Sequence, residues 1–92
     1  MKIFISQPYN TSKKEILKNQ EKVVSYLCDD YCGVYPTVIN NLSDLNITEK
    51  IRNSDFVIFI NHWKPKFNLD TIMIKHYEIA KRFNKETIYY TI

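Results

Sequence analysis

The sequence contains a single glycine and only three prolines. Walker-type phosphate loops and GxGxxG dinucleotide fingerprints both need several glycines where the backbone approaches a phosphate. Both motifs are therefore excluded. The shortage of glycine also predicts that helix ends and turns use Asn, Asp or Ser instead.

Cysteines and long apolar runs are scarce as well. Cys28 and Cys32 do not form a CxxC motif, and no second Cys/His cluster accompanies them, so we expect no metal site. No apolar run approaches the roughly 20 residues of a transmembrane helix. The short apolar run at residues 3–5 is not a signal peptide. We therefore expect a cytoplasmic protein with reduced thiols, no cofactor and no membrane partner.

The charge of the chain is nearly balanced, with 13 basic and 10 acidic residues and a net charge of +3. The lysines interleave with acidic residues, which is typical of solvated helix faces, so we expect no nucleic-acid polymer as a partner. The small excess of positive charge suits a small anionic ligand. The length predicts one domain over residues 1–92. A domain this small gains from self-association, so we expect a homo-oligomer, a dimer or higher.

Apolar runs alternate with helix-period stripes along the chain. Strands are predicted at 2–5, 34–39, 55–60 and 87–92, and Pro36 confines the second to a sheet edge or a late start. Helices are predicted from a cap at Thr11 or Ser12 to about 31, within 42–54, and from Asn68 or Asp70 to about 84. The short middle helix, capped by Ser43 or Asn46, is expected to contain Leu45, Ile47 and Ile51.

Two helices are expected to bury one apolar stripe each. The stripe of the first helix is predicted to contain Ile16, Leu17, Gln20, Val24, Leu27, Cys28 and Tyr31. The stripe of the last helix is predicted to contain Leu69, Ile72, Met73, His76, Ile79, Ala80 and Phe83.

The alternation of strands and helices predicts an α/β fold, a Rossmann-like or flavodoxin-like three-layer sandwich. Its four-stranded parallel sheet has helices on both faces. The first and third strands are apolar on both faces, which favours interior positions and the order 2-1-3-4. Such sheets bind ligands at the carboxyl ends of the strands where the order reverses, here between the first and third strands.

Polar loops follow both interior strands. The first contains Ser6, Gln7, Pro8, Tyr9 and Asn10, and the second contains Asn61, His62 and Trp63. Amides and hydroxyls suit ribose hydroxyls and base edges, and the aromatic rings can stack on a base. We predict a ligand site between these loops; the alternative is two well-capped loops with a core tryptophan. His76 points towards the sheet, either as a buried, hydrogen-bonded histidine or as a further site residue.

Two segments carry a family resemblance. Residues 2–8 (KIFISQP) with Tyr9 and Asn10, and residues 54–59 (SDFVIF) leading to Trp63, resemble the nucleoside 2-deoxyribosyltransferase-like superfamily. They are most similar to its small phage and prophage branch, which opens with KIFISQPMNG. That branch carries an EHEIA-like stretch where this chain has KHYEIAK at 75–81. The resemblance implies a Rossmann-like fold and a nucleoside or nucleotide pocket, often completed by a second subunit.

The resemblance also bears on catalysis. In the active transferases of the superfamily a helix glutamate attacks the anomeric carbon of the sugar. The alignment places His76 at that position, and a neutral histidine cannot form the same glycosyl ester. We therefore expect a protein without catalytic residues that binds a nucleotide-type small molecule. A phage origin suggests that it sequesters a nucleotide immune signal in the host cytoplasm, as an anti-defence protein.

Two other functions stay open from the sequence. The first is an N-glycosidic bond hydrolase or transferase that uses Glu78 or Asp70 as its nucleophile. The second is an interaction module that inhibits a host protein through its aromatic surface.

Overall fold

The computed structural model describes residues 1–8, 11–31, 36–39, 45–61 and 71–91. The elements follow in the order β1 (Lys2–Ser6), α1 (Lys13–Asp30), β2 (Thr37–Val38), α2 (Ile47–Arg52), β3 (Phe56–Asn61), α3 (Thr71–Arg82) and β4 (Glu86–Thr91). The strands form one parallel sheet in the order β2-β1-β3-β4. The predicted fold class and strand order are therefore confirmed.

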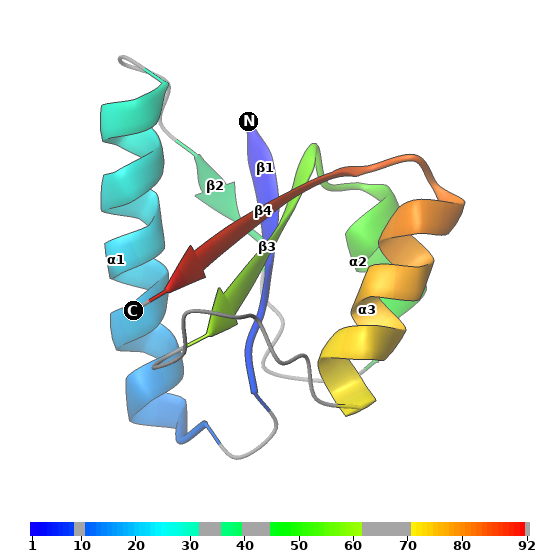
Figure 1. Ribbon diagram of the computed structural model, residues 1–92, viewed down its shortest axis with the longest axis horizontal. Helices are drawn as coiled ribbons and strands as arrows, with labels where there is room; N and C mark the ends of the chain where they lie inside the picture. Colours follow the sequence, from blue (N-terminus) through cyan, green and yellow to red (C-terminus); the bar gives the residue numbers. More distant parts are fainter. Residues whose placement is uncertain (9–10, 32–35, 40–44, 62–70, 92) are drawn as a thin grey trace.

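The sheet lies between two helical layers. Figure 1 shows α1 on one side of the sheet and α2 and α3 on the other. Successive side chains of β1 alternate between these layers, as the pleat of a strand requires. Ile3 and Ile5 pack with Val23 and Leu27 of α1, whereas Phe4 packs in the cluster that contains α2 and α3 residues. Both faces of β1 are therefore buried, in agreement with its apolar sequence.

The start of α1 agrees with the sequence. Ser12 is the N-cap, and its side-chain oxygen accepts a hydrogen bond from the backbone N–H of Glu15 at 3.2 Å. This bond satisfies one of the amide groups that the first helical turn leaves unpaired.

The buried stripe of α1 differs from the predicted one. Asn19, Val23 and Leu27 are buried, whereas Leu17 and Tyr31 are 47% and 40% exposed. The placement of Leu17 and Tyr31 in the stripe was therefore wrong. The buried stripe is rotated around the helix relative to the predicted one, because it includes Asn19. A pattern of apolar residues alone does not assign a polar residue to the buried face.

The middle of the chain forms shorter elements than expected. β2 contains two residues, begins after Pro36 and lies at a sheet edge, as the proline predicted. Ile47 and Ile51 are buried residues of α2, but Leu45 precedes this helix and is 73% exposed. The expectation that Leu45 belongs to the helix was therefore wrong. Ser43 lies outside the described residues, as do the predicted caps of α3, Asn68 and Asp70.

Asparagine takes the place of glycine at two helix ends. Asn46 precedes α2 with φ 59°, without a side-chain capping bond, and Asn84 follows α3 with φ 55°. After α3, the N–H of Asn84 donates to the carbonyl of Lys81 at 3.1 Å, and that of Lys85 donates to Ala80 at 2.9 Å. These are the two bonds of a Schellman motif, which normally needs glycine at the left-handed position.

Among the described residues, none of the helices has the length and apolar character that crossing a bilayer requires.

Candidate functional site

A buried hydrogen bond lies at the carboxyl end of β1. Oγ of Ser6 is 2.8 Å from Nδ1 of His76 on α3, 70 positions further along the chain. Ser6 is fully buried and His76 is 6% exposed. β1 and β3 are the neighbours between which the strand order reverses. The pair therefore lies where open α/β sheets bind ligands.

The local sequence explains why these two side chains meet. Ser6 is two residues after Phe4, so both side chains point to the face that α3 covers. His76 is three residues after Met73 and three before Ile79, both buried, so it belongs to the stripe of α3 that faces the sheet. The imidazole also meets the ring of Phe4 edge-on, with centroids 5.1 Å apart at 83°. The ring is therefore held by a hydrogen bond and by an aromatic contact.

The chemistry of this pair is limited by its burial. A serine and a histidine at hydrogen-bond distance can act as nucleophile and base. Here the Ser6 side chain has no exposed surface, so a substrate atom cannot reach Oγ in this conformation. With a neutral imidazole, the pair is neutral in either tautomer and offers donors and acceptors in fixed positions. Because the pair is buried, its effect on a ligand would be indirect, through the position in which it holds the end of β1 and the loop that follows.

Gln7 has a different set of partners. Its Oε1 accepts a hydrogen bond from Nδ2 of Asn19 at 3.1 Å, and its Nε2 donates to the carbonyl of Ile16 at 3.3 Å. Both ends of the amide therefore fasten α1 to the end of β1, on the sheet face opposite Ser6. Apolar periodicity missed Asn19, although its spacing of four residues from Val23 indicates a shared face. A role for Gln7 in ligand binding stays a prediction.

The structure places the other predicted site residues as follows. Pro8 is half-buried, and its carbonyl accepts a hydrogen bond from the N–H of Thr11 at 3.1 Å. Asn61 is the last residue of β3, in register with Thr91 of β4. Glu78 is exposed on α3. Five predicted residues lie outside the described part of the chain, namely Tyr9, Asn10, His62, Trp63 and Asp70.

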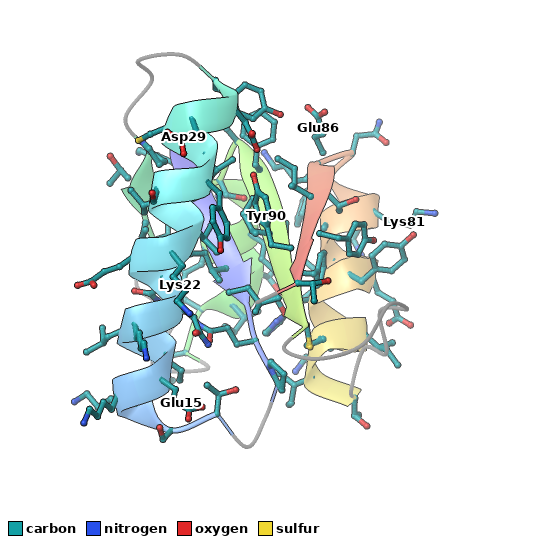
Figure 2. All side chains as sticks on the ribbon, turned by 60° about the vertical axis from the view of Figure 1, so that its left-hand side comes forward. Glu15, Lys22, Asp29, Lys81, Glu86 and Tyr90 are labelled. Atoms are coloured by element: carbon teal, nitrogen blue, oxygen red, sulfur yellow. The ribbon has the colours of Figure 1, made fainter. Side chains whose placement is uncertain are left out.

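A hollow lies on the α1 side of the sheet, away from the Ser6–His76 pair. It has a volume of about 270 Å³ and is lined by Tyr26, Asp29, Asp30 and Tyr90. Figure 2 shows Asp29 at the end of α1, with Tyr90 in the sheet layer behind it. The Tyr90 hydroxyl donates to Oδ2 of Asp30 at 2.8 Å, and the rings of Tyr26 and Tyr90 are 5.4 Å apart. Burial, and then the Asp30 carboxylate, raise the pKa of Tyr90 well above its ordinary value.

Within the described residues, no three or more His, Cys, Asp and Glu side chains gather in an arrangement that could hold a metal ion.

Comparisons with known proteins point to a fold. No family model matches the chain, and no curated protein matches its sequence. Among solved structures, the chain is similar to the 2-desoxiribosyltransferase from Leishmania mexicana, with a TM-score of 0.64 and 14% sequence identity. The match covers 98% of this chain and 63% of that chain, so this chain spans less than two thirds of the neighbour's length. The protein therefore shares the fold of this transferase, as the resemblance of its first residues implied.

Proposed function

We propose that this protein binds a nucleoside- or nucleotide-derived small molecule at the carboxyl ends of β1 and β3. The observation that supports this most is the buried Ser6–His76 hydrogen bond at the point where the strand order reverses. Burying a hydroxyl and an imidazole costs free energy of desolvation that an apolar pair of similar size avoids. The polar pair therefore favours a role in positioning the end of β1 for a ligand, and the similarity to a deoxyribosyltransferase supports a nucleoside-type ligand.

We infer that the ligand is bound without turnover. The family resemblance places His76 where the active transferases have their nucleophilic glutamate. Its imidazole is hydrogen-bonded to Ser6, whose own hydroxyl is inaccessible. Glu78 follows two residues later, about 200° around the helix, and is exposed. Neither residue is therefore suited to attack a sugar bound against the end of β1.

The biological role that we propose is sequestration of a nucleotide signal. The opening KIFISQP supports membership of the small phage and prophage branch of the superfamily. In a host cytoplasm, a binder without turnover could withdraw a nucleotide messenger of antiviral defence. We propose that Tyr9, Asn10, Asn61, His62 and Trp63 complete the pocket, and that the protein is a homo-oligomer.

Ligand binding can be tested directly on the purified chain. The small molecules that it releases on heating are identified by mass spectrometry, and thermal unfolding is measured with nucleosides, nucleotides and NAD. We expect an intact ligand, and a stabilisation of about 2.7 kcal/mol when the free ligand is at a hundred times its Kd. If no compound raises the Tm and none is released, the binding proposal is wrong and the interaction module remains.

Variants locate the site. We expect Ser6→Ala and His76→Gln to weaken ligand binding measured by calorimetry, because each removes one partner of the buried hydrogen bond. Ser25→Ala, at an exposed serine of α1, is the matched control and should bind as the wild type does. Trp63→Ala tests the stacking predicted from sequence and should cost about 1–3 kcal/mol of binding free energy. Unchanged affinity in both Ser6→Ala and His76→Gln would place the ligand elsewhere.

The absence of turnover needs its own measurement. The protein is incubated with nucleosides and NAD, and free base is measured by chromatography. We expect none. Free base that disappears in Glu78→Gln would instead support the hydrolase or transferase alternative.

A further inference from the structure

The hollow beside the last two turns of α1 combines two kinds of side chain. Tyr26, Asp29 and Asp30 of α1 and Tyr90 of β4 line it, and its volume is about 270 Å³. Asp29 and Asp30 lie three and four positions after Tyr26, so the three side chains share one face of the helix. Pockets for drug-sized ligands are usually somewhat larger. The hollow therefore suits a smaller molecule that can contact two aromatic rings and two carboxylates.

The rings of Tyr26 and Tyr90 form the apolar part of the hollow. Their centroids are 5.4 Å apart, and their planes are tilted by 43°. Tyr90 is half-buried, whereas Tyr26 is 39% exposed and offers ring surface to a ligand. The face of an aromatic ring attracts a cation that lies within about 6 Å of its centre. The two rings therefore favour a positively charged ligand with an aliphatic body.

The two carboxylates lie where α1 itself does not balance their charge. The carboxyl end of a helix carries partial negative charge, which makes acidic side chains there unfavourable. The last turn of α1 has no basic residue, and Figure 2 shows Lys22 further back, near the middle of the helix. Within the described part of the chain, no ion pair involves Asp29 or Asp30.

The carboxylate of Asp30 retains capacity for a ligand. It accepts one hydrogen bond, from the Tyr90 hydroxyl at 2.8 Å. A carboxylate can accept about four hydrogen bonds, so this bond fixes the position of Asp30 and leaves acceptor sites for N–H donors. Asp29 is exposed next to it. The hollow therefore offers two acceptors for charged N–H groups beside an apolar wall.

We propose that this hollow binds an aliphatic polyamine. Two ammonium groups joined by a short alkyl chain match the two carboxylates, and the chain matches the rings of Tyr26 and Tyr90. Ammonium N–H groups donate charge-assisted hydrogen bonds to carboxylates, whereas a quaternary ammonium has no N–H to donate. A divalent metal ion fits less well, because two carboxylates supply fewer oxygen atoms than the roughly six to eight that Ca²⁺ takes.

The polyamine site is separate from the proposed nucleotide site. Ser6 and His76 meet on the sheet face that α3 covers, whereas the hollow lies on the α1 face. Ser6→Ala should therefore bind a polyamine as the wild type does. Removal of the carboxylates of Asp29 and Asp30 should leave nucleotide binding unchanged, so failure of one proposal is distinguishable from failure of the other.

Calorimetry with 1,4-diaminobutane tests the proposal on the full chain at low ionic strength. We expect saturable binding of one molecule per chain, which weakens as salt screens the carboxylates. 1-Aminobutane has the same alkyl chain and a single ammonium, as a lysine side chain has, and should bind at least about tenfold more weakly. Calcium at the same concentration as the diamine should not displace it.

Variants of α1 locate the site. Asp29→Asn combined with Asp30→Asn removes both charges and should raise the Kd for 1,4-diaminobutane at least about tenfold. Tyr26→Leu should also weaken binding, whereas Tyr26→Phe keeps the ring and should bind as the wild type does. Glu21→Gln removes an exposed carboxylate of the same helix that does not line the hollow. It is the matched control and should leave the Kd unchanged.

Circular dichroism verifies that each variant is folded. Should the double asparagine variant unfold, Asp29→Asn alone tests the same contact. Absence of binding by the wild type overturns the proposal, as does a folded double variant that binds normally. Equal affinity for 1-aminobutane overturns the choice of a polyamine. A Kd that rises as much in Glu21→Gln as in the double variant overturns the assignment to this hollow, because it indicates attraction to charge anywhere on α1.

Discussion

Ser6 and Gln7 are consecutive buried residues that serve opposite faces of the sheet. The hydroxyl of Ser6 meets His76 of α3, 70 positions away. The amide of Gln7 meets Asn19 and Ile16 of α1, 12 and 9 positions away. One contact therefore connects β1 to the distant helix α3 at the reversal of strand order, and the other fastens a helix to the strand just before it. Both polar groups are buried, so burial does not distinguish them; the partner and the place in the topology do, and they are the basis of the proposed site.

The types of side chain that pack on the two faces of the sheet also differ. Around the Ser6–His76 pair the cluster contains aromatic rings, with Phe4 against His76 and Phe59 against Tyr77 and Tyr89. On the α1 face the buried residues are all aliphatic, namely Ile3, Ile5, Val23, Leu27, Ile58 and Ile60. The aromatic rings on that face, Tyr26, Tyr31, Phe56 and Tyr90, are half-buried or exposed. We therefore expect changes on the α3 face to affect ligand binding together with stability, and changes on the α1 face to affect stability alone.

The largest effect is expected from Phe4→Ala. Removing a fully buried phenylalanine ring lowers the free energy of unfolding by about 3–5 kcal/mol. The same change removes the edge contact with His76, so ligand affinity should fall in the molecules that remain folded. Urea denaturation and calorimetry measure the two effects. Leu17→Ala, at an exposed leucine of α1, is the control and should change stability by less than about 0.5 kcal/mol.

A smaller effect is expected from Asn19→Ala. This change leaves Oε1 of Gln7 buried without its donor, which costs about 1–3 kcal/mol of stability. Ligand affinity should stay at the wild-type value, because the lost bond lies on the α1 face. A loss of affinity as large as that of Ser6→Ala would show that the two faces do not act separately.

The smallest effect, about 1 kcal/mol, is expected from Tyr90→Phe, which removes the hydrogen bond to Asp30. Because burial and Asp30 raise the pKa of Tyr90, the folded chain retains this proton above pH of about 10, where an unfolded chain releases it. The protonated Tyr90 hydroxyl therefore contributes its full stabilisation of the folded state below a pH of about 10, and this stabilisation is lost as the pH rises further.

Thermal unfolding measured across that range checks the sign. The decline of stability with rising alkaline pH should be shallower in Tyr90→Phe than in the wild type. Leu17→Ala should keep the wild-type slope. A steeper decline in Tyr90→Phe would contradict the assigned direction.

The architecture could be predicted because the interior strands are continuous runs of apolar residues in the sequence. The runs at β1 and β3 are apolar on both faces, which placed them inside the sheet, and the spacing of His76 with Ile79 directed the imidazole towards it. The exposed Leu17 and the buried Asn19 were missed, because the buried stripe of α1 includes a polar residue, Asn19, whose partner is the amide of Gln7. The partner of Ser6 could not be predicted either, since only the register of β1, β3 and α3 brings His76 to it.

The separation of Ser6 and His76 has a consequence for biosynthesis. A contact across 70 positions cannot form in a local folding unit, and closing so long a loop costs entropy that other native contacts must offset. During translation, β1 is complete long before α3 leaves the ribosome. A nascent chain that lacks α3 therefore has no partner for Ser6, so the proposed site can form only after α3 has been synthesised.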